Sequence, residues 1–274
     1  MALSADAIAR QLQRTDVDLE VVASTGSTNA DLMDRARAQA PSRVILRATA
    51  RQTAGRGRRG RAWHASAGGS LLFSLALPWS SAPDSTSAVT LACGVAVAEC
   101  LHAHGVEVQL KWPNDILLDG RKLAGILTEI AEDPAGARTL VIGMGLNLLL
   151  DPVQRQAIEQ PVAELAERLG REAAHADREL WLARLAAALI DAAMQFDARG
   201  FGGMREQFNA RFAYLGRRVS LHGAGQPAQS GIARGVDDQG RLLLECHGRL
   251  FKRISGEMGL RADFSGADEH REQT

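Results

Sequence analysis

The sequence has few aromatic residues, few cysteines and no net charge. Aromatic residues make up 4% of the 274-residue chain, and 32 acidic side chains balance 32 basic ones. A protein built for non-specific binding to nucleic acid is usually globally basic, so this balance argues against that class. The three cysteines, Cys93, Cys100 and Cys246, are odd in number and form no CxxC pair. We interpret them as structural thiols in a reducing compartment.

Long hydrophobic runs are also missing. The first fourteen residues contain no continuous apolar region, which excludes a signal peptide at that position. The longest apolar stretches, residues 71–79 and 140–150, are roughly half the length of a membrane span. We therefore expect a cytoplasmic protein that neither spans nor binds a membrane.

Hydrophobic periodicity predicts an α+β fold with a mixed or antiparallel sheet and helices packed on one face. We expect strands at 18–23, 44–48, 70–77, 106–110, 115–118, 122–130 and 139–149, and helices at 4–14, 28 onward, 86–104, 161–169, 177–199 and 204–212. Asp119-Gly120 is a strong hairpin signal between two of these strands. Thr28 to Asp31 matches a capping box at the start of the second helix.

From about residue 217 the pattern changes to short strands separated by glycine turns, which is typical of a small barrel. We predict a main domain over residues 1–214, a small barrel domain over 215–264 and a disordered tail over 265–274.

The segment Gly55-Arg-Gly-Arg-Arg-Gly-Arg61 is rich in arginine and glycine and lies in a long loop, residues 51–69. Guanidinium groups suit bidentate binding of phosphate or carboxylate, and glycines allow the backbone to approach a ligand closely. The segment therefore predicts a loop that closes over a polyphosphate. Two alternatives are a nucleic-acid-binding patch and a merely solvated basic loop.

Two further segments carry polar groups at strand ends. In Lys111-Trp-Pro-Asn-Asp115 the proline restricts the residue before it to extended conformations, so that Asn114 and Asp115 project from a rigid corner. The alternative is that Asn-Asp forms an ordinary turn. Lys122 follows the hairpin turn, and strict alternation places it on the face of Ala124 and opposite Gly125. Such a lysine needs an anionic partner if it is buried, and otherwise it is a surface residue.

Other common catalytic patterns are missing or incomplete. The arginine segment lacks the Lys-Ser/Thr ending of a phosphate-binding P-loop, and Gly143-x-Gly145 has leucine where a dinucleotide fingerprint requires a third glycine. No Gly-x-Ser-x-Gly elbow occurs. His102 and His104 have no cysteine or carboxylate constellation that would complete a zinc site.

The order of these segments resembles the biotin protein ligase family. Ser27-Thr-Asn29, Gln52 with the arginine segment, Lys111–Asp115, Arg121–Gly125 and the stretch ending at Asn147 follow one another at family-like spacing. Residues 231–244 resemble the family's C-terminal domain. The resemblance implies a class II synthetase-like catalytic fold followed by an SH3-like barrel.

The resemblance also implies site residues. Those carried over to biotin are Ser27, Thr28, Asn29, Gln52, Arg56, Gly57, Arg58 and Lys122. Those carried over to ATP or the adenylate are Arg58, Arg59, Arg61, Trp63 near the adenine, Asn114, Asp115 and Asn147. Lys122, Arg58 and Arg56 would be catalytic. Asn114 and Asp115 would also serve magnesium, although the metal ligands themselves are left unassigned.

The implied activity is formation of biotinyl-5'-AMP from biotin and ATP with Mg²⁺, followed by transfer to a lysine of a biotin carboxyl carrier protein, as in acetyl-CoA carboxylase. A homodimer is possible. About 25 residues precede Ser27, too few for the DNA-binding domain that some members carry, so we expect a ligase without operator binding. The alternatives are a lipoate or octanoate enzyme of the same fold, a nucleic-acid-binding module and a biotin sensor that transfers nothing.

Overall fold

The computed structural model describes residues 2–65, 68–82, 85–158, 160–223, 226–254 and 258–262. Within these ranges, seven strands form the main sheet: β1 (Val17–Val22), β2 (Val44–Thr49), β3 (Ser70–Trp79), β4 (Gln109–Lys111), β5 (Asp115–Leu118), β6 (Arg121–Glu132) and β7 (Arg138–Asn147). Their order in space is β1-β2-β3-β7-β6-β5-β4. The predicted α+β class and mixed sheet are confirmed.

The sheet is antiparallel except at one edge. β1 and β2 run parallel, with Val17 opposite Val44, and the helix α2 (Thr28–Ala38) connects them. β5 and β6 form the predicted hairpin, in which Asp119 and Gly120 both have positive φ values of 48° and 72°. Two consecutive positive φ angles are the geometry that a two-residue Asp-Gly turn provides.

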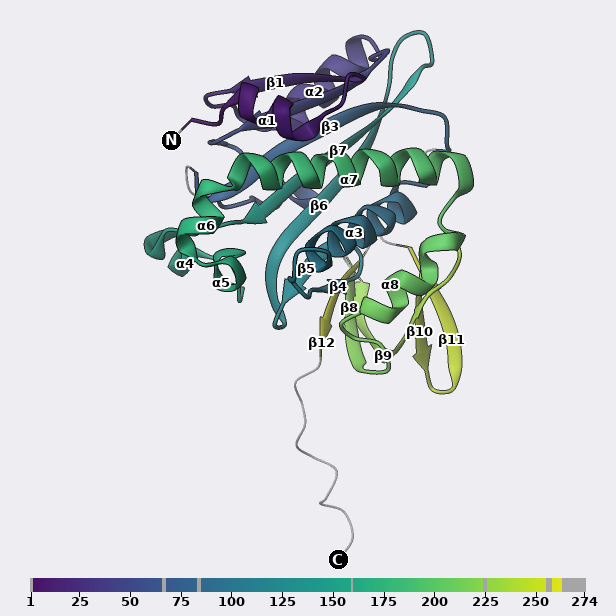
Figure 1. Ribbon diagram of the computed structural model, residues 1–274. Helices are drawn as coiled ribbons and strands as arrows, with labels where there is room; N and C mark the ends of the chain where they lie inside the picture. Colours follow the sequence, from purple (N-terminus) through teal and green to yellow (C-terminus); the bar gives the residue numbers. More distant parts are fainter. Residues whose placement is uncertain are drawn as a thin grey trace, which may run out of the picture.

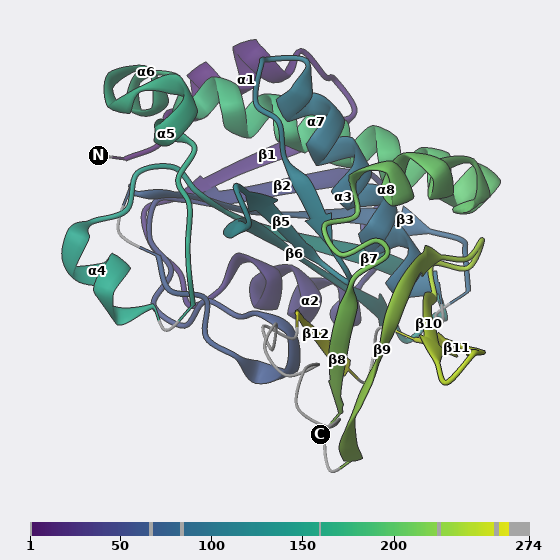
Figure 2. The same cartoon turned by 90° about the horizontal axis from the view of Figure 1, so that it is seen from below.

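Helices cover both faces of the sheet, and the prediction of a single covered face is wrong. The helices α1 (Ala5–Leu12), α3 (Thr86–His102) and α7 (Arg178–Arg199) lie on one face and α2 lies on the other, as Figure 2 shows. Leu32 and Met33 of α2 pack against Ile45 and Val141 in a small core of their own. Periodicity identified α2 as a helix, but it does not determine which side of a sheet a helix covers.

Two helix predictions also need correction. Ser27, not Thr28, is the N-cap of α2, because its side chain accepts a hydrogen bond from the backbone of Ala30. The predicted helix at 161–169 is confined to α5 (Ala166–Leu169), since the chain before it runs beside β6 and Val162 bridges to Lys122.

Four shorter helical elements connect the main sheet to the C-terminal region. They are α4 (Pro152–Ala157), α6 (Arg171–Ala176), η3 (Gly202–Met204) and α8 (Arg205–Arg211). α8 falls within the helix expected at 204–212 and η3 ends at its first residue, whereas α4 and α6 were not predicted.

A second sheet follows the long helix α7 (Figure 1). It contains β8 (Arg218–Gly223), β9 (Gln226–Val236), β10 (Leu242–Cys246), β11 (Arg249–Arg253) and β12 (Met258–Ala262), in the order β11-β10-β9-β8-β12. β11 and β12 are its two edges within the described residues, so closure into a barrel remains a prediction. The predicted disordered tail, 265–274, lies outside the described residues.

This small sheet packs on the main domain at one turn. The indole nitrogen of Trp112, which is fully buried, donates a hydrogen bond to the carbonyl of Gly240 at 3.2 Å. Gly240 lies against Ala88 and Leu91 of α3. In the part of the chain that the structure describes, no helix is long and apolar enough to cross a membrane.

Candidate functional site

A cavity of about 740 Å³ opens beside the face of the main sheet that carries α2. Every residue that the sequence analysis assigned to a site lines it, from Ser27 to Asn147. The structure therefore brings together segments more than a hundred residues apart in sequence. Lining a cavity does not establish what each residue binds, so the individual roles remain predictions.

One end of the cavity carries neutral polar groups. Gln52 Oε1 accepts hydrogen bonds from the backbone nitrogen of Thr28 at 2.8 Å and from its hydroxyl at 3.1 Å. The Thr28 hydroxyl is also 2.8 Å from that of Ser74, on β3. Ser27, Thr28 and Ser74 are all buried. This end is suited to a polar ring without charge.

The arginine loop folds back on itself. Gly57 donates to the carbonyl of Arg61 at 2.7 Å and Trp63 donates to that of Gly55 at 2.9 Å, so the loop is a tight excursion with a short helical turn at Arg58–Gly60. Arg59 takes a φ of 58° there. The loop is thus held at its base by backbone hydrogen bonds.

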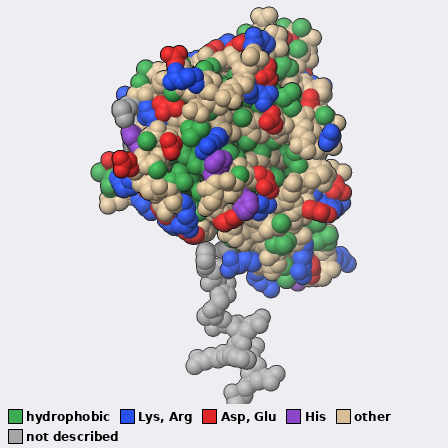
Figure 3. All heavy atoms as spheres, in the orientation of Figure 1, with side chains coloured by type: hydrophobic (Ala, Val, Ile, Leu, Met, Phe, Trp, Pro, Cys, Tyr) green, Lys and Arg blue, Asp and Glu red, His purple; other side chains and the backbone are tan. Residues whose placement is uncertain are grey.

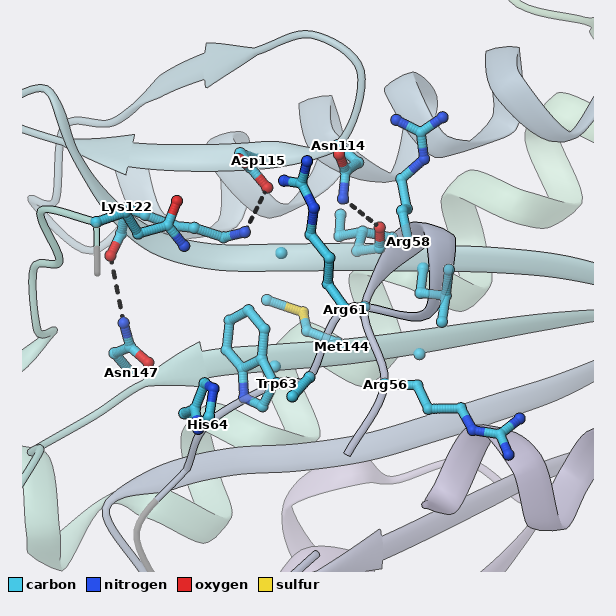
Figure 4. A pocket seen from close by; sticks show the side chains of 18 of the residues that line it. Arg56, Arg58, Arg61, Trp63, His64, Asn114, Asp115, Lys122, Met144 and Asn147 are labelled. Carbon is cyan, nitrogen blue, oxygen red and sulfur yellow. Dashed lines mark hydrogen bonds and ion pairs between the residues drawn. The ribbon is translucent and has the colours of Figure 1, made fainter. Parts of the chain in front are cut away.

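Electrostatic repulsion is concentrated in this loop. Burial lowers the pKa of the Arg58 guanidinium, and the nearby charges of Arg59 and Arg61 lower it further, while Asp115 acts in the opposite direction. An anion placed among these side chains would relieve the repulsion. In Figure 4, Arg61 extends toward the strand that carries Asp115, whereas Arg56 points away from it.

The Trp63 ring packs against the backbone of two glycines in the wall of the cavity. A Cβ atom added at Gly145 would be 2.4 Å from the ring, and one added at Gly125 would be 3.1 Å from it. A side chain at Gly145 would therefore force the ring to move, whereas one at Gly125 would require only a small shift of the ring. The amine of Lys122 lies 5.4 Å from the ring centroid, within the range of a cation–π contact.

Asp115 and Lys122 form an ion pair between neighbouring strands (Figure 4). Lys122 Nζ is 2.7 Å from Asp115 Oδ1, and Lys111 Nζ is 3.7 Å from Asp115 Oδ2. Asn114 donates from Nδ2 to the carbonyl of Ile126 at 3.1 Å. The chain does turn at residues 112–114, where Asn114 N donates to the carbonyl of Lys111 at 3.1 Å, as the turn alternative expected. Lys122 is mostly buried and has an anionic partner, as expected for a buried lysine.

The predicted side-chain alternation around Lys122 is wrong. The β5–β6 ladder shifts register after Ile116, where Ile116 pairs with Ala124 and Leu117 pairs with Lys122. Leu123 and Ala124 are consequently both buried in the core, and Lys122 shares a face with Gly125. A bulge inserts one residue into a strand and re-aims the side chains on one side of it, which strict alternation cannot anticipate.

Asn147 ties three segments together at the end of β7. Its Nδ2 donates to the carbonyl oxygens of Lys122 and Ala163, each at 3.2 Å. The backbone of Lys122 is further held by Pro161, whose carbonyl accepts from Lys122 N at 3.0 Å. Asn147 therefore fixes the strand that presents Lys122, in addition to lining the cavity.

Sequence reasoning missed several residues of the cavity wall. They are Ser74, Gly125, Gly143, Gly145, Tyr214 and His222. The Gly143-x-Gly145 pattern was visible but was considered only as an incomplete dinucleotide fingerprint. The two glycines of this pattern leave part of the cavity wall without side chains. Burial raises the pKa of Tyr214.

The described residues contain no group of three or more metal-ligating side chains. His102 is paired with Glu107 instead, and His104 with the carbonyl of Cys100. Figure 3 shows acidic and basic side chains mixed over the face it displays, without a continuous basic area of the kind nucleic-acid binding uses.

Comparisons with known proteins place this cavity in context. A family model described as the biotin/lipoate A/B protein ligase family matches residues 21–147, and one described as the biotin protein ligase C terminal domain matches residues 214–261. The biotin–[acetyl-CoA-carboxylase] ligase of Mycobacterium tuberculosis is 36% identical over 245 residues, which cover 88% of each chain. The bifunctional ligase/repressor of Salmonella typhimurium is 34% identical over 261 residues, covering 95% of this chain and 79% of that protein.

Among solved structures, biotin protein ligase from Aquifex aeolicus in complex with biotin and ATP superposes with a TM-score of 0.72. The match has 25% sequence identity and covers 91% of this chain and all of that one.

Proposed function

The chain belongs to the biotin/lipoate protein ligase family and is a ligase with the fold of biotin protein ligases, and we propose that it acts in two steps. The carboxylate of biotin attacks the α-phosphorus of ATP, which forms biotinyl-5'-AMP and releases pyrophosphate. A lysine amine of a biotin carboxyl carrier protein then attacks the acyl carbon, so that an amide forms, AMP leaves and the amine loses a proton.

The observation that carries the proposal is the separation of polar and cationic groups within one cavity. The neutral end, with Thr28, Gln52 and Ser74, suits an uncharged polar ring. The arginine loop and Lys122 lie along the rest of the cavity, where a carboxylate and a polyphosphate would meet. Both reactants of the first step are anions, and fixed positive groups stabilise charge that develops on phosphoryl oxygens.

We propose separate roles for the residues of the cationic region. We assign Lys122 to the biotin carboxylate and then to the mixed anhydride, and Arg58, Arg59 and Arg61 to the phosphates. Asn114 and Asp115 are assigned to the nucleotide. The base that deprotonates the acceptor lysine has no candidate that the geometry favours.

The arginine loop has a second task. A mixed anhydride hydrolyses in water, so it must be shielded until the carrier arrives. The loop is anchored at its base by the Gly55–Trp63 hydrogen bond, and its arginines lie along the cavity. We propose that binding of the anionic adenylate closes it.

Magnesium fits this site only together with its nucleotide. Asp115 is a carboxylate at the nucleotide side, but it is already paired with Lys122 and Lys111. Mg²⁺ is commonly held by one or two carboxylates plus substrate phosphates, so Asp115 would contribute one ligand and ATP most of the others. The ion would supply charge neutralisation on the phosphates.

The proposed partner is the biotin carrier of acetyl-CoA carboxylase or a related carboxylase, consistent with the name of the Mycobacterium tuberculosis relative. β1 is an edge of the main sheet, and an exposed edge can pair with a strand of a carrier or of a second copy of this chain.

A transfer assay tests the second step. Purified protein, ATP, Mg²⁺ and biotin are incubated with a carrier domain, and intact-mass spectrometry detects added biotin. Modification should require ATP and should vanish when the carrier's acceptor lysine is replaced by arginine. Modification by lipoate instead would keep the adenylation chemistry and overturn the substrate, whereas tight biotin binding without any transfer would support a sensor.

A further inference from the structure

Asn29, in the first turn of α2, has one half of its amide bonded and the other half without a partner. Its Nδ2 donates to Glu129 Oε2 at 2.5 Å, across 100 positions of sequence. Its Oδ1 is buried and has no hydrogen-bond partner among the residues that the structure describes. The side chain as a whole is only 4% exposed. Buried acceptors are rarely left unpaired in native proteins, so this oxygen requires an explanation.

Glu129 determines which way this amide faces. An ionised carboxylate can only accept hydrogen bonds, so the Asn29 group that meets it must be the NH₂. The Oδ1 atom then lies on the other side, against Gly143 on β7, where an added Cβ would approach it to 2.6 Å. Asn29 and Gly143 both line the cavity, whereas Glu129 lies behind Asn29, farther along β6.

The neighbouring hydroxyl groups bond to other atoms. The Thr28 hydroxyl donates to Gln52 Oε1. It is also 2.8 Å from the Ser74 hydroxyl, and either of the two can be the donor in that pair. Neither hydroxyl is a hydrogen-bond partner of Asn29 Oδ1 among the described residues, so this acceptor is left for a donor from outside the chain.

We propose that Glu129 is a positioning residue for substrate selection: it holds the Asn29 amide so that Oδ1 accepts a hydrogen bond from an N–H group on the ring of the bound acid. This rests on the proposed function, because biotin's ureido ring carries such N–H groups. The dithiolane ring of lipoate and the alkyl chain of octanoate carry none. The Glu129–Asn29 pair therefore favours an acid with an N–H-bearing ring over its apolar relatives, since a buried polar group left unpaired selects strongly against a ligand that cannot satisfy it.

Calorimetric titration with biotin, and separately with ATP, tests this. In Glu129→Gln the new amide can meet Asn29 with either its oxygen or its NH₂, so the orientation of Asn29 is no longer fixed. We expect the Kd for biotin to rise about tenfold, which is about 1.4 kcal/mol, while the Kd for ATP stays the same. Glu132→Gln, the same change at an exposed position near the end of β6, is the matched control and should leave both unchanged.

A reciprocal exchange separates positioning from general stability. Asn29→Asp alone places two carboxylates face to face and should abolish measurable biotin binding. The double variant Asn29→Asp with Glu129→Gln restores one donor, one acceptor and a free acceptor oxygen, and should recover biotin binding to within about threefold of the wild type. Melting curves identify any variant that is unfolded.

The outcomes are distinct. Absence of biotin binding by the wild-type protein would overturn the proposed function, and this inference with it. Normal biotin binding by the wild type together with an unchanged Kd in Glu129→Gln would overturn the inference alone. An equal loss of biotin and ATP binding in Glu129→Gln would also overturn it, because the effect would then be structural.

Discussion

Lys122 Nζ lies 2.7 Å from Asp115 Oδ1, so the lysine proposed to meet the substrate carboxylate is held by a carboxylate of the protein itself. Both side chains are largely buried, at 16% and 13% exposure. Asp115 belongs to β5 and Lys122 to β6, and the bulge after Ile116 aims the lysine into the cavity. The position of the amine therefore depends on a strand irregularity as well as on a charge pair.

Replacing Asp115 should disturb that position. In Asp115→Asn the amide oxygen can still accept a hydrogen bond from Lys122, but the opposite charge that holds this largely buried amine is lost, and the bond is weaker. We expect kcat/KM for biotin activation to fall by roughly 10- to 100-fold. Asp119→Asn at the exposed hairpin turn is the control, since asparagine also tolerates the positive φ there. Equal activity of the two variants would contradict the account.

Glycine at position 145 should be required for the observed position of the Trp63 ring. In Gly145→Ala the new Cβ would lie 2.4 Å from the indole ring, so the ring and the loop that carries it must shift. A displacement of about 1 Å can cost about 100-fold in rate. Gly203→Ala, where a Cβ meets nothing within 4 Å, should be close to wild type in steady-state assays. A fully active Gly145→Ala enzyme would show that activity does not depend on this position of the Trp63 ring.

Two glycines of the small sheet test how much its contact with α3 stabilises the protein. Gly240 and Gly248 have nearly equal φ values, 70° and 72°, but a Cβ at Gly240 would be 3.0 Å from Ala88 while one at Gly248 meets nothing. Both alanine variants carry a backbone cost of about 1–2 kcal/mol. Urea melts should show a larger loss in Gly240→Ala, because it also disturbs packing against α3. Equal losses would mean that this turn does not join the two parts.

Cys93 supplies a pH-dependent prediction. Burial raises the pKa of its thiol from 9.0 to about 12. A raised folded-state pKa means that the neutral thiol stabilises the fold fully below pH 9, and that this contribution is lost as pH rises from about 9 toward 12. The difference in free energy of unfolding between wild type and Cys93→Ala should narrow over that range in urea melts. A difference in free energy of unfolding that stays constant with pH would contradict the raised pKa of Cys93.

The sequence predicted the elements with strong periodicity. The residues that the family resemblance singled out all line one cavity, and their roles stay predictions. Placement across the sheet was not predictable: the side covered by α2 depends on which face offers Ile45 and Val141 for packing. The orientation of Lys122 could not be predicted either, because one extra residue at Leu123 changes it.

The sequence analysis also missed two short helices and the role of two glycines in the cavity wall. α4 and α6 are six residues each, too short for a hydrophobic period to register. Gly143 and Gly145 act through the side chains they lack, and only the positions of Asn29 and Trp63 reveal that role. Glu129 carries no motif signal, since its importance comes from a hydrogen bond between β6 and α2, 100 positions apart in sequence.

The most direct test of the central claim is exchange of labelled pyrophosphate into ATP, with biotin, lipoate and octanoate as parallel acids. The account predicts exchange with biotin alone, reduced at least about 100-fold in Lys122→Ala and Arg58→Ala, as expected when groups that stabilise developing charge are removed. Exchange driven by lipoate, or no exchange with any acid by folded protein that binds biotin, would contradict it.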